Sequence, residues 1–394
     1  MSMDNQERVI HAPEFTPGNA LQIPIYRVLQ QDGSIIPGAV VPDLDEAQAL
    51  KIYRAMVFTR VLDERMLAAQ RQGRLSFYLQ STGEEATTVG FAAALDDADM
   101  IMAQYREQGA LAYRGFSIEE FMNQLFGNDQ DYGKGRQMPI HYGSRELHYM
   151  TISSPLATQI PQATGYAYGQ KLAGQQRCTV TVFGEGAASE GDFHAALNMA
   201  AVLKVPVIFL CRNNGYAIST PSSEQFAGDG IAPRAVGYGM QSIRVDGNDV
   251  LAVCKAMQEA RKLAVEQNEP VLVEAMSYRL AAHSSSDDPS GYRNKAEEDK
   301  WRAKDPILRM KNWLLAQNWW DEAQEKQLLE ELRQQVLAAM KLAQQRPPAK
   351  LEDLITDVYD EPPALLRQQL ENLKAHIRKY PAAYPKSAGG IDHG

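Results

Sequence analysis

The stretch from Cys178 to Leu280 alternates short apolar runs with longer amphipathic segments. The runs CTVTVF, VPVIFLCR and PVLVEAMSYRL are largely continuous in apolar residues and do not alternate with polar ones. Strands of this kind are buried on both faces, which is typical of a parallel sheet with helices on each side. The intervening segments DFHAALNMAAVLK and VLAVCKAMQEARKLAVEQ have the composition of helices. We therefore predict an α/β fold, with a mostly parallel sheet and helices on both faces.

The rest of the chain adds segments before and after this block. Its 394 residues exceed the roughly 250–300 residues at which a single hydrophobic core stops growing. Residues 1–44 are rich in proline and glycine, and they predict an extended N-terminal arm or a short hairpin over Asp32-Gly33. The α/β domain is expected over residues 45–290, and its first element is a long helix that Gly73 ends. The charged sequence that follows predicts a helical C-terminal extension over residues 291–394.

Composition argues against several classes of protein. The net charge is −9 and no basic patch stands out, which argues against nucleic acid as a partner. No apolar run approaches the roughly 18 residues that span a bilayer. The three cysteines are widely spaced and lie in or beside apolar runs, so we expect reduced, buried thiols. The N-terminal residues carry neither an apolar signal core nor an Arg-rich pattern, which predicts a cytoplasmic location.

Polar residues follow two of the predicted strands. Gly184-Glu185-Gly186 comes at the end of one strand, and Asn213-Asn214 at the end of the next. Ligands of parallel α/β sheets bind at the carboxyl ends of the strands, so Glu185 and Asn214 are expected to converge if these strands are neighbours. A helix N-terminus contributes only about 0.3–1 kcal/mol toward an anion, too little to hold a diphosphate beside a carboxylate. A divalent cation removes the conflict, and Mg²⁺ commonly binds one or two carboxylates together with substrate phosphates.

The Gly-Glu-Gly triplet has little specificity by itself. No Gly-Lys-Ser follows it, so it is not a P-loop, and its glycines do not fit the dinucleotide fingerprint. Alone it is more typical of a tight turn with a solvated glutamate. The paired polar residues at two successive strand ends favour the metal–diphosphate interpretation.

The pattern resembles the thiamine diphosphate fingerprint. The wider text FGEGAASEGD, CRNNGYAISTP, GKGRQMPIHYG, ISSPLATQIPQA, SIRVDGNDV and HSSSDDPSGYR resembles the α subunits of branched-chain 2-oxo acid dehydrogenases. The resemblance runs from about Pro42 to the C-terminus and implies the diphosphate-binding domain of the thiamine diphosphate-binding fold. Glutamate at position 185 distinguishes it from pyruvate dehydrogenase α subunits, which usually have aspartate there.

The resemblance implies a set of site residues. Mg²⁺ would be held by Glu185, Asn214 and the backbone carbonyl of Tyr216. Phosphate would be contacted by Tyr105, Arg106, Arg212, Arg279 and backbone groups of Gly186 and Ala187. The full set of cofactor-binding residues implied is Tyr105, Arg106, Ser154, Leu156, Gly184, Glu185, Gly186, Ala187, Arg212, Asn214, Tyr216, Arg279 and His283.

The loop ISSPLATQ resembles a potassium site. Its ligands would be Ser153, Pro155, Thr158 and Gln159, whose hydroxyl, carbonyl and amide oxygens suit a hard monovalent cation. The alternative is a helix N-terminus capped by serine.

His283 is the implied catalytic residue, because histidine titrates near neutral pH and this one follows a strand end. The mammalian motif has two consecutive histidines where this chain has Ala282-His283, which puts in doubt any role that needs two imidazoles. Ser284 matches a regulatory phosphorylation site of mitochondrial homologues, although an unmodified loop serine is the simpler interpretation. His141 lies in a loop near the cofactor segments and is a second candidate to face the substrate.

One group that this chemistry needs is missing from the predicted domain. In the enzymes that this chain resembles, a glutamate from a separate pyrimidine-binding domain activates the cofactor. Glu84 and Glu85 are the internal rivals, but their position before the diphosphate strands favours a subunit interface. The resemblance therefore implies a β subunit, a heterotetramer of two α and two β chains, and a lipoyl-bearing acyltransferase that receives the acyl group.

The implied reaction is the oxidative decarboxylation of a branched 2-oxo acid such as 3-methyl-2-oxobutanoate. Two alternatives stay open at the level of sequence. One is the α subunit of a pyruvate or acetoin dehydrogenase, with the same cofactor and a smaller substrate. The other is a non-catalytic subunit that keeps the fold as a scaffold.

Overall fold

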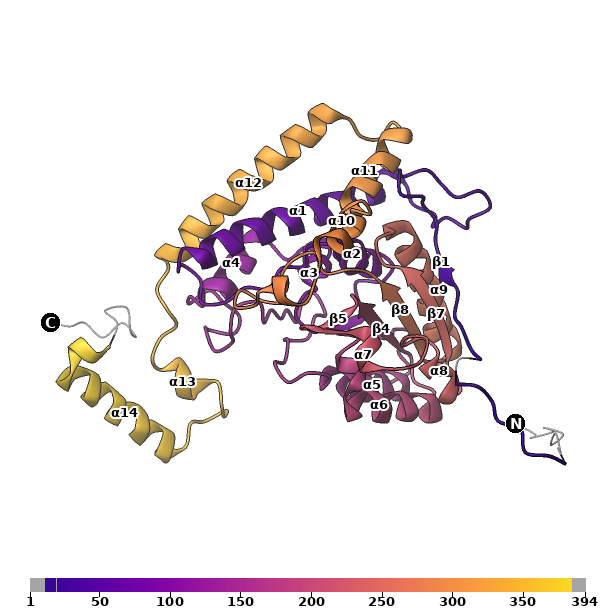
Figure 1. Cartoon of the computed structure of the whole chain (residues 1–394). Helices are drawn as coiled ribbons and strands as arrows, with labels where there is room; N and C mark the ends of the chain where they lie inside the picture. The colour runs from indigo at the N-terminus through magenta and orange to yellow at the C-terminus, as the bar shows by residue number, and fades with distance from the viewer. Residues whose placement is uncertain (1–10, 19, 385–394) are drawn as a thin grey trace.

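The computed structural model describes residues 11–18 and 20–384 (Figure 1). Its centre is a six-stranded sheet in the order β1-β7-β8-β4-β3-β2, in which every neighbouring pair runs parallel. The strands are β1 (Ile25–Tyr26), β2 (Met100–Met102), β3 (Thr179–Gly184), β4 (Val207–Asn213), β7 (Gln241–Asp246) and β8 (Val271–Met276). Strands β5 (Tyr216–Ala217) and β6 (Thr220–Pro221) form a small antiparallel pair. The predicted fold class is confirmed.

Two hydrophobic cores lie on the two faces of this sheet. In β4, Ile208 and Leu210 face one core, whereas Phe209 and Cys211 face the other. Because successive side chains of a strand point to opposite faces, both sets must be apolar when both faces are covered. This geometry explains why the strand sequences are continuously apolar.

The helices divide between the two cores. The first core contains residues of α1 (Glu46–Arg71), α2 (Glu85–Ala93), α3 (Gln108–Arg114), α4 (Ile118–Phe126) and α9 (Val250–Gln267). The second contains residues of α5 (Gln159–Leu172), α6 (Gly191–Leu203) and α8 (Arg234–Gly237), and Figure 1 shows α5 and α6 side by side. The short α7 (Ser222–Gln225) follows β6. Among the described residues, no helix is both long enough and apolar enough to cross a bilayer.

Helix α1 begins and ends where the sequence predicts. Asp45 caps it by accepting from the backbone N of Gln48, and the Gln48 side chain accepts from the backbone N of Asp45 in return. This reciprocal pair is a capping box. After Gln72 the chain leaves the helix through Gly73, whose φ of +72° favours glycine.

The segment RLSFYLQS after α1 has β-type residues, which predict a strand, but it is not a strand. Side chains, not a neighbouring strand, satisfy its polar groups. The Asp63 carboxylate of α1 accepts from the hydroxyl of Tyr78 at 2.8 Å and from the backbone N of Ser81 at 2.6 Å. A local pattern of residues cannot reveal such a partner.

The N-terminal arm lies against the sheet. Val28 and Leu29 are buried, and their backbone N–H groups donate to Asp249 at 2.8 and 2.6 Å. A tight turn follows, in which the backbone N of Gln30 donates to the carbonyl of Ser34. The described part of the arm therefore has both predicted features, an extended segment that lies on the sheet domain and a short turn over Asp32-Gly33.

The C-terminal part is helical, with α10 (Lys295–Arg302), α11 (Pro306–Ala316), α12 (Glu322–Gln345), α13 (Asp353–Thr356) and α14 (Ala364–Lys379). Helices α11 and α12 add Met310, Trp313, Val336 and Met340 to the same core as α1. Helices α13 and α14 lie away from the sheet (Figure 1). The domain boundary near residue 290 stays a prediction, because the packing of α11 and α12 is continuous with that of the sheet domain.

Candidate active site

A cavity of about 190 Å³ lies at the carboxyl ends of β3, β4 and β8. It is the place where ligands of parallel α/β sheets bind. Every implied cofactor-binding residue except Ser154 lines it. The complete lining is Gln104, Tyr105, Arg106, Leu156, Gly184, Glu185, Gly186, Ala187, Arg212, Asn214, Tyr216, Ala217, Ile218, Arg279 and His283.

The two polar strand ends meet in this cavity. Strands β3 and β4 are neighbours, and Gly184 stands opposite Arg212. The backbone N of Asn214 donates to Glu185 Oε2 at 3.2 Å, and the Asn214 Oδ1 accepts from the backbone N of Tyr216 at 3.3 Å. Glu185 is 1% exposed, and its Oε1 is a buried oxygen without a hydrogen-bond partner among the described residues. Burial raises the pKa of this carboxyl group.

Arg212, an implied phosphate contact, is paired with two carboxylates inside this chain. Its Nη1 donates to Glu84 at 2.6 Å and its Nε donates to Glu107 at 2.5 Å, and all three side chains are almost fully buried. Its guanidinium charge is therefore already balanced by two carboxylates, although Nη2 takes part in neither pair. The sequence analysis placed Glu84 and Glu85 at a subunit interface. Both are instead 0% exposed inside this chain, and Glu85 pairs with Arg60 at 2.8 Å.

Two other guanidinium groups lie beside His283. Arg106 Nη2 donates to the His283 carbonyl at 2.5 Å and lies 3.2 Å from Nδ1. Arg279 Nη1 lies 3.4 Å from the same nitrogen. Because both neighbours are donors, Nδ1 accepts and the ring proton belongs on Nε2. Burial, followed by the charges of Arg106 and Arg279, lowers the pKa of His283 to about 4.

A short network fixes the loop that carries His283. The backbone N of His283 donates to Asp287 at 2.7 Å, and the Tyr292 hydroxyl donates to the same carboxylate oxygen at 2.6 Å. Arg279 Nη2 donates to the Tyr292 hydroxyl at 3.1 Å. The resemblance of this loop to the family does not assign a role to Asp287 or Tyr292. The position of Asp287, four residues after His283, could have indicated that its carboxylate accepts from the backbone of this loop.

The implied potassium ligands are partly gathered. Thr158 Oγ1 donates to the Pro155 carbonyl at 3.0 Å and lies 3.4 Å from Ser153 Oγ. The Gln159 amide nitrogen instead donates to the Val182 carbonyl at 3.0 Å. Ser154 does not line the cavity. Its hydroxyl lies 2.8 Å from Nε2 of His141, so the second candidate histidine contacts this loop.

Three lining residues escaped the sequence analysis, namely Gln104, Ala217 and Ile218. Gln104 accepts from the backbone N of Gly184 at 2.8 Å and so fixes the end of β3. Ala217 explains why position 186 is glycine, because an added Cβ there would lie 2.7 Å from the Ala217 side chain. These contacts arise from chain crossings that residue spacing does not reveal.

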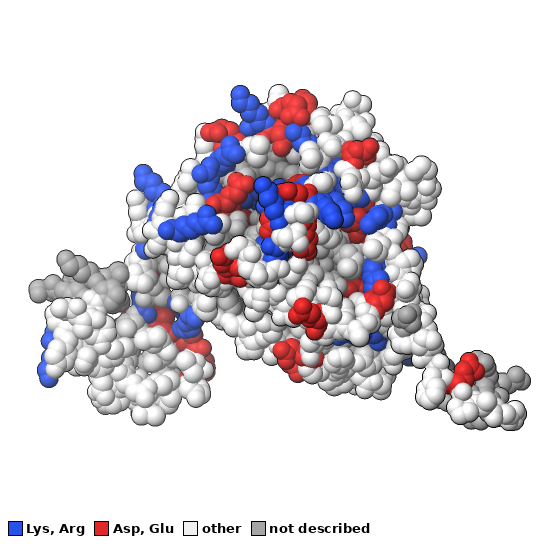
Figure 2. Space-filling view, viewed as in Figure 1, with Lys and Arg blue, Asp and Glu red and all other residues white. Residues whose placement is uncertain are grey.

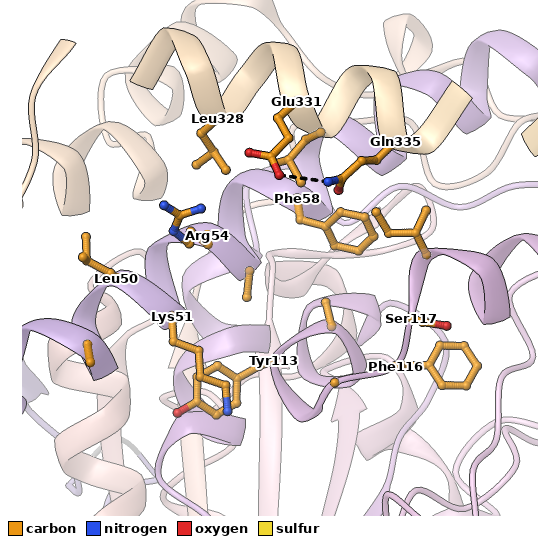
Figure 3. Close-up of a pocket in the computed structure, with 16 residues that line it drawn as sticks. Leu50, Lys51, Arg54, Phe58, Tyr113, Phe116, Ser117, Leu328, Glu331 and Gln335 are labelled. Atoms are coloured by element: carbon orange, nitrogen blue, oxygen red, sulfur yellow. Dashed lines mark hydrogen bonds between the residues drawn. The ribbon is translucent and has the colours of Figure 1, made fainter. Parts of the chain in front are cut away.

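A larger cavity, of about 500 Å³, lies between α1, α12 and the α3–α4 segment (Figure 3). Figure 3 shows Phe58, Phe116 and Leu328 among its walls, with Lys51 and Arg54 on α1. It shares no lining residue with the strand-end cavity. We take the smaller cavity as the candidate site, because polar groups converge there and buried oxygens lack partners.

Metal chemistry at the strand-end cavity would depend on mixed oxygen donors. Within the described ranges, no three His, Cys, Asp or Glu side chains gather as a metal-binding group. A cation beside Glu185 would therefore need the Asn214 amide, backbone carbonyls and a ligand of its own. This donor set matches Mg²⁺, which takes oxygen ligands and shares them with bound phosphates.

The chain is similar to curated 2-oxoisovalerate dehydrogenase alpha subunits. The mitochondrial alpha subunit of Homo sapiens is 53% identical over 382 residues, which cover 96% of this chain and 85% of that protein. That of Caenorhabditis elegans is 51% identical over 365 residues, covering 92% and 84%. Subunit alpha 1 of Arabidopsis thaliana is 50% identical over 374 residues, covering 94% and 79%.

The names of these relatives contradict the predicted cytoplasmic location, because all three are described as mitochondrial. That prediction used the first residues of the chain. Residues 1–10 lie outside the described part of the structure. Composition at the start of a sequence is therefore a poor guide to location here.

A family model gives the broader assignment. The model of the dehydrogenase E1 component matches residues 53–352, which include the sheet, the strand-end cavity and α10 to α12. The match covers well over half of the chain, and it agrees with the relatives found along nearly the whole length. The chain belongs to the dehydrogenase E1 component family.

Proposed function

We propose that this chain is the alpha subunit of a branched-chain 2-oxo acid dehydrogenase. The reaction would be the oxidative decarboxylation of 2-oxo acids such as 3-methyl-2-oxobutanoate, with transfer of the acyl group to the lipoyl group of an acyltransferase. The observation that carries the proposal is the meeting of Glu185 and Asn214 at neighbouring strand ends, with one Glu185 oxygen buried and unpaired. The relatives named for 2-oxoisovalerate support the substrate class.

Thiamine diphosphate and Mg²⁺ fit the groups that line the cavity. Glu185, the Asn214 amide and the backbone carbonyl of Tyr216 would hold the metal. Arg106 and Arg279 offer positive charge to a diphosphate, and both are almost fully buried. When bound, thiamine diphosphate supplies the electron sink for decarboxylation. The remaining cofactor contacts would come from the lining residues that the resemblance implies.

His283 would handle protons in this site. With a pKa of about 4 it is neutral at physiological pH, and two guanidinium groups hold the value down after burial. A bound diphosphate would offset those two positive charges, because an opposite charge nearby favours the protonated ring. The pKa of His283 would then rise toward the neutral range in which acid–base catalysis is efficient.

The potassium site stays part of the proposal. Thr158 lies within hydrogen-bonding reach of both Ser153 and Pro155, and the loop leads directly into α5. Gln159 would have to present its amide oxygen to the ion while its nitrogen keeps the bond to Val182. Bound potassium would order this loop and, through Leu156, one wall of the cavity.

A β subunit would complete the site, in a heterotetramer of two alpha and two beta chains. The glutamate that activates the aminopyrimidine would come from that partner, since Glu84 and Glu85 are occupied by Arg212 and Arg60. The surface of α5 and α6 suits a partner. Figure 2 shows few charges on the lower part of the molecule, where these helices lie. The exposed large apolar side chains of the two helices are Tyr166, Tyr168, Leu172, Met199, Val202 and Leu203.

The test is co-expression with the β subunit, followed by decarboxylation assays with thiamine diphosphate and Mg²⁺. Turnover of 3-methyl-2-oxobutanoate should exceed that of pyruvate, which separates this function from a pyruvate or acetoin dehydrogenase. Cofactor should raise the melting temperature of the wild-type assembly but not that of Glu185→Ala. Decarboxylation by the alpha chain alone, or a preference for pyruvate, would overturn the assignment.

A further inference from the structure

Glu84 lies where two of the proposed cofactor-binding side chains meet. Its Oε1 accepts from Arg212 Nη1 at 2.6 Å and from the Asn214 amide nitrogen at 3.3 Å. All three side chains are buried. The side-chain amide of asparagine has two possible orientations, which exchange its oxygen and nitrogen. A hydrogen-bond acceptor beside the nitrogen selects one of them. With Nδ2 facing Glu84, the Asn214 oxygen is the end left for the strand-end cavity.

The side chain of Glu84, the residue before α2, makes no capping hydrogen bond to that helix. Its second oxygen, Oε2, is buried without a hydrogen-bond partner among the described residues. The ion pair with Arg212 holds the carboxylate of Glu84 against the site.

The backbone around Glu84 is tightly constrained. Gly83 has a φ of +96°, and an added Cβ there would lie 2.3 Å from the carbonyl oxygen of Tyr278. The backbone N of Leu280 donates to the Thr82 carbonyl at 3.0 Å, which ties this loop to the chain that leaves β8. A residue that orients others must itself be fixed by its surroundings.

We infer that Glu84 is a positioning residue for metal binding, because it turns the Asn214 amide so that its oxygen faces the ion. The inference rests on the proposed function. Glu107 provides a comparison within the same cluster. It holds Arg212 through Nε, and its other oxygen accepts from the backbone N of Gln104 and of Arg106, but it has no bond to Asn214. Both glutamates pair with Arg212, but among the described residues only Glu84 accepts a hydrogen bond from the Asn214 amide nitrogen.

The experiment measures Mg²⁺ binding by calorimetry in the α–β assembly with saturating thiamine diphosphate. Glu84→Gln should weaken Mg²⁺ affinity by about 10–100-fold, the usual effect of losing a group that orients a metal ligand. Glu107→Gln should leave Mg²⁺ affinity close to that of the wild type, while both variants weaken thiamine diphosphate binding. Wild-type Mg²⁺ affinity in Glu84→Gln, or an equal loss in Glu107→Gln, would overturn the inference.

A second variant keeps the test decisive if Glu84→Gln does not assemble. Glu84→Asp keeps the negative charge for Arg212 but withdraws it by one methylene, so it cannot reach both partners. It should assemble and still bind Mg²⁺ more weakly than the wild type, and unchanged affinity would refute the inference. If the wild-type assembly itself binds neither Mg²⁺ nor thiamine diphosphate, the proposed function fails rather than the role of Glu84.

Discussion

At the scale of single residues, His283 shows how its surroundings set its protonation. Arg106 and Arg279 both present donors to Nδ1, and the ring is half-buried between them. In the free chain, burial and the charges of these two neighbours keep the ring neutral. The same two cations are the groups that would bind a phosphate anion, so anion binding and proton affinity at His283 are coupled.

The free protein should therefore lose stability through His283 as the pH falls. The unfolded histidine binds a proton below about pH 6.5, whereas the folded one does so only near its pKa of about 4. As the pH falls between these two values, protonation of the unfolded state lowers the free energy of unfolding. Above pH 6.5 His283 has almost no such effect. After allowance for the partial exposure of the ring, the effect is about 1–2 kcal/mol between pH 7 and 5.

Urea unfolding of the wild type and His283→Gln, without cofactor, checks this expectation. The wild type should lose more free energy of unfolding than the variant as the pH is lowered from 7 to 5. Pyrophosphate should reduce the difference, because it offsets the two guanidinium charges. Parallel curves for the two proteins would contradict the lowered pKa.

Residue patterns predicted that Glu185 and Asn214 meet, but they did not predict the buried side chains around this pair. The meeting of Glu185 and Asn214 follows from consecutive strands in a parallel sheet, which needs only local sequence and one topological rule. The partners of Arg212 are 105 and 128 residues away in the chain. No periodicity joins such distant positions, so Glu84 was predicted to lie at an interface although it is buried here.

At the scale of elements, the loop before α2 connects the helix layer with the exit of β8. Gly83 presses against the backbone of Tyr278, and the Glu85 carboxylate accepts from the backbone N of Gly83 at 2.9 Å. The loop therefore has no room for a side chain at Gly83. Its geometry places the Glu84 carboxylate beside the end of β4.

Gly83→Ala should destabilise the chain by about 2–5 kcal/mol, from a positive φ and a contact with backbone that cannot move aside. Gly115→Ala is the matched control. Its φ is +98°, but nothing lies within 4 Å of an added Cβ, so only the backbone strain of about 1–2 kcal/mol applies. Chemical denaturation of both variants gives the comparison, and equal losses would show that the close contact is not limiting.

The strands and long helices could be predicted because their signals are local and strong. Continuous apolar runs predicted β3, β4 and β8, and Gly73 predicted the end of α1. The prediction of a strand at RLSFYLQS was wrong because the Asp63 carboxylate of α1, and not a neighbouring strand, accepts hydrogen bonds from this segment. The packing of α11 and α12 against α1 was also invisible, since an amphipathic helix shows which face is buried but not against what.

At the scale of the whole molecule, α5 and α6 carry exposed apolar side chains. Leu156 lines the cavity, is 45% exposed, and lies shortly before α5. Val202 and Leu172 are the most exposed large apolar side chains on these two helices. Exposed apolar surface of this kind marks protein interaction sites.

Val202→Glu should abolish co-purification with the β subunit while leaving the alpha chain folded. A charge buried in an apolar interface without a partner is costly, which is the physical reason for the loss. Leu308→Glu is the control, because Leu308 is also exposed but lies on α11. Size-exclusion chromatography and circular dichroism report assembly and folding separately. A Val202→Glu chain that still co-purifies with the β subunit would place the interface elsewhere.

The two-residue strand β1 has a consequence beyond the site. Ile25 and Tyr26 pair with Arg244 and Val245, so they occupy hydrogen-bonding groups along the outer side of β7. An uncovered parallel edge can recruit strands from neighbouring molecules and seed fibrous aggregates. Pairing with β1 covers this part of the β7 edge, and the two-residue length of β1 leaves only a short new edge for another chain to pair with.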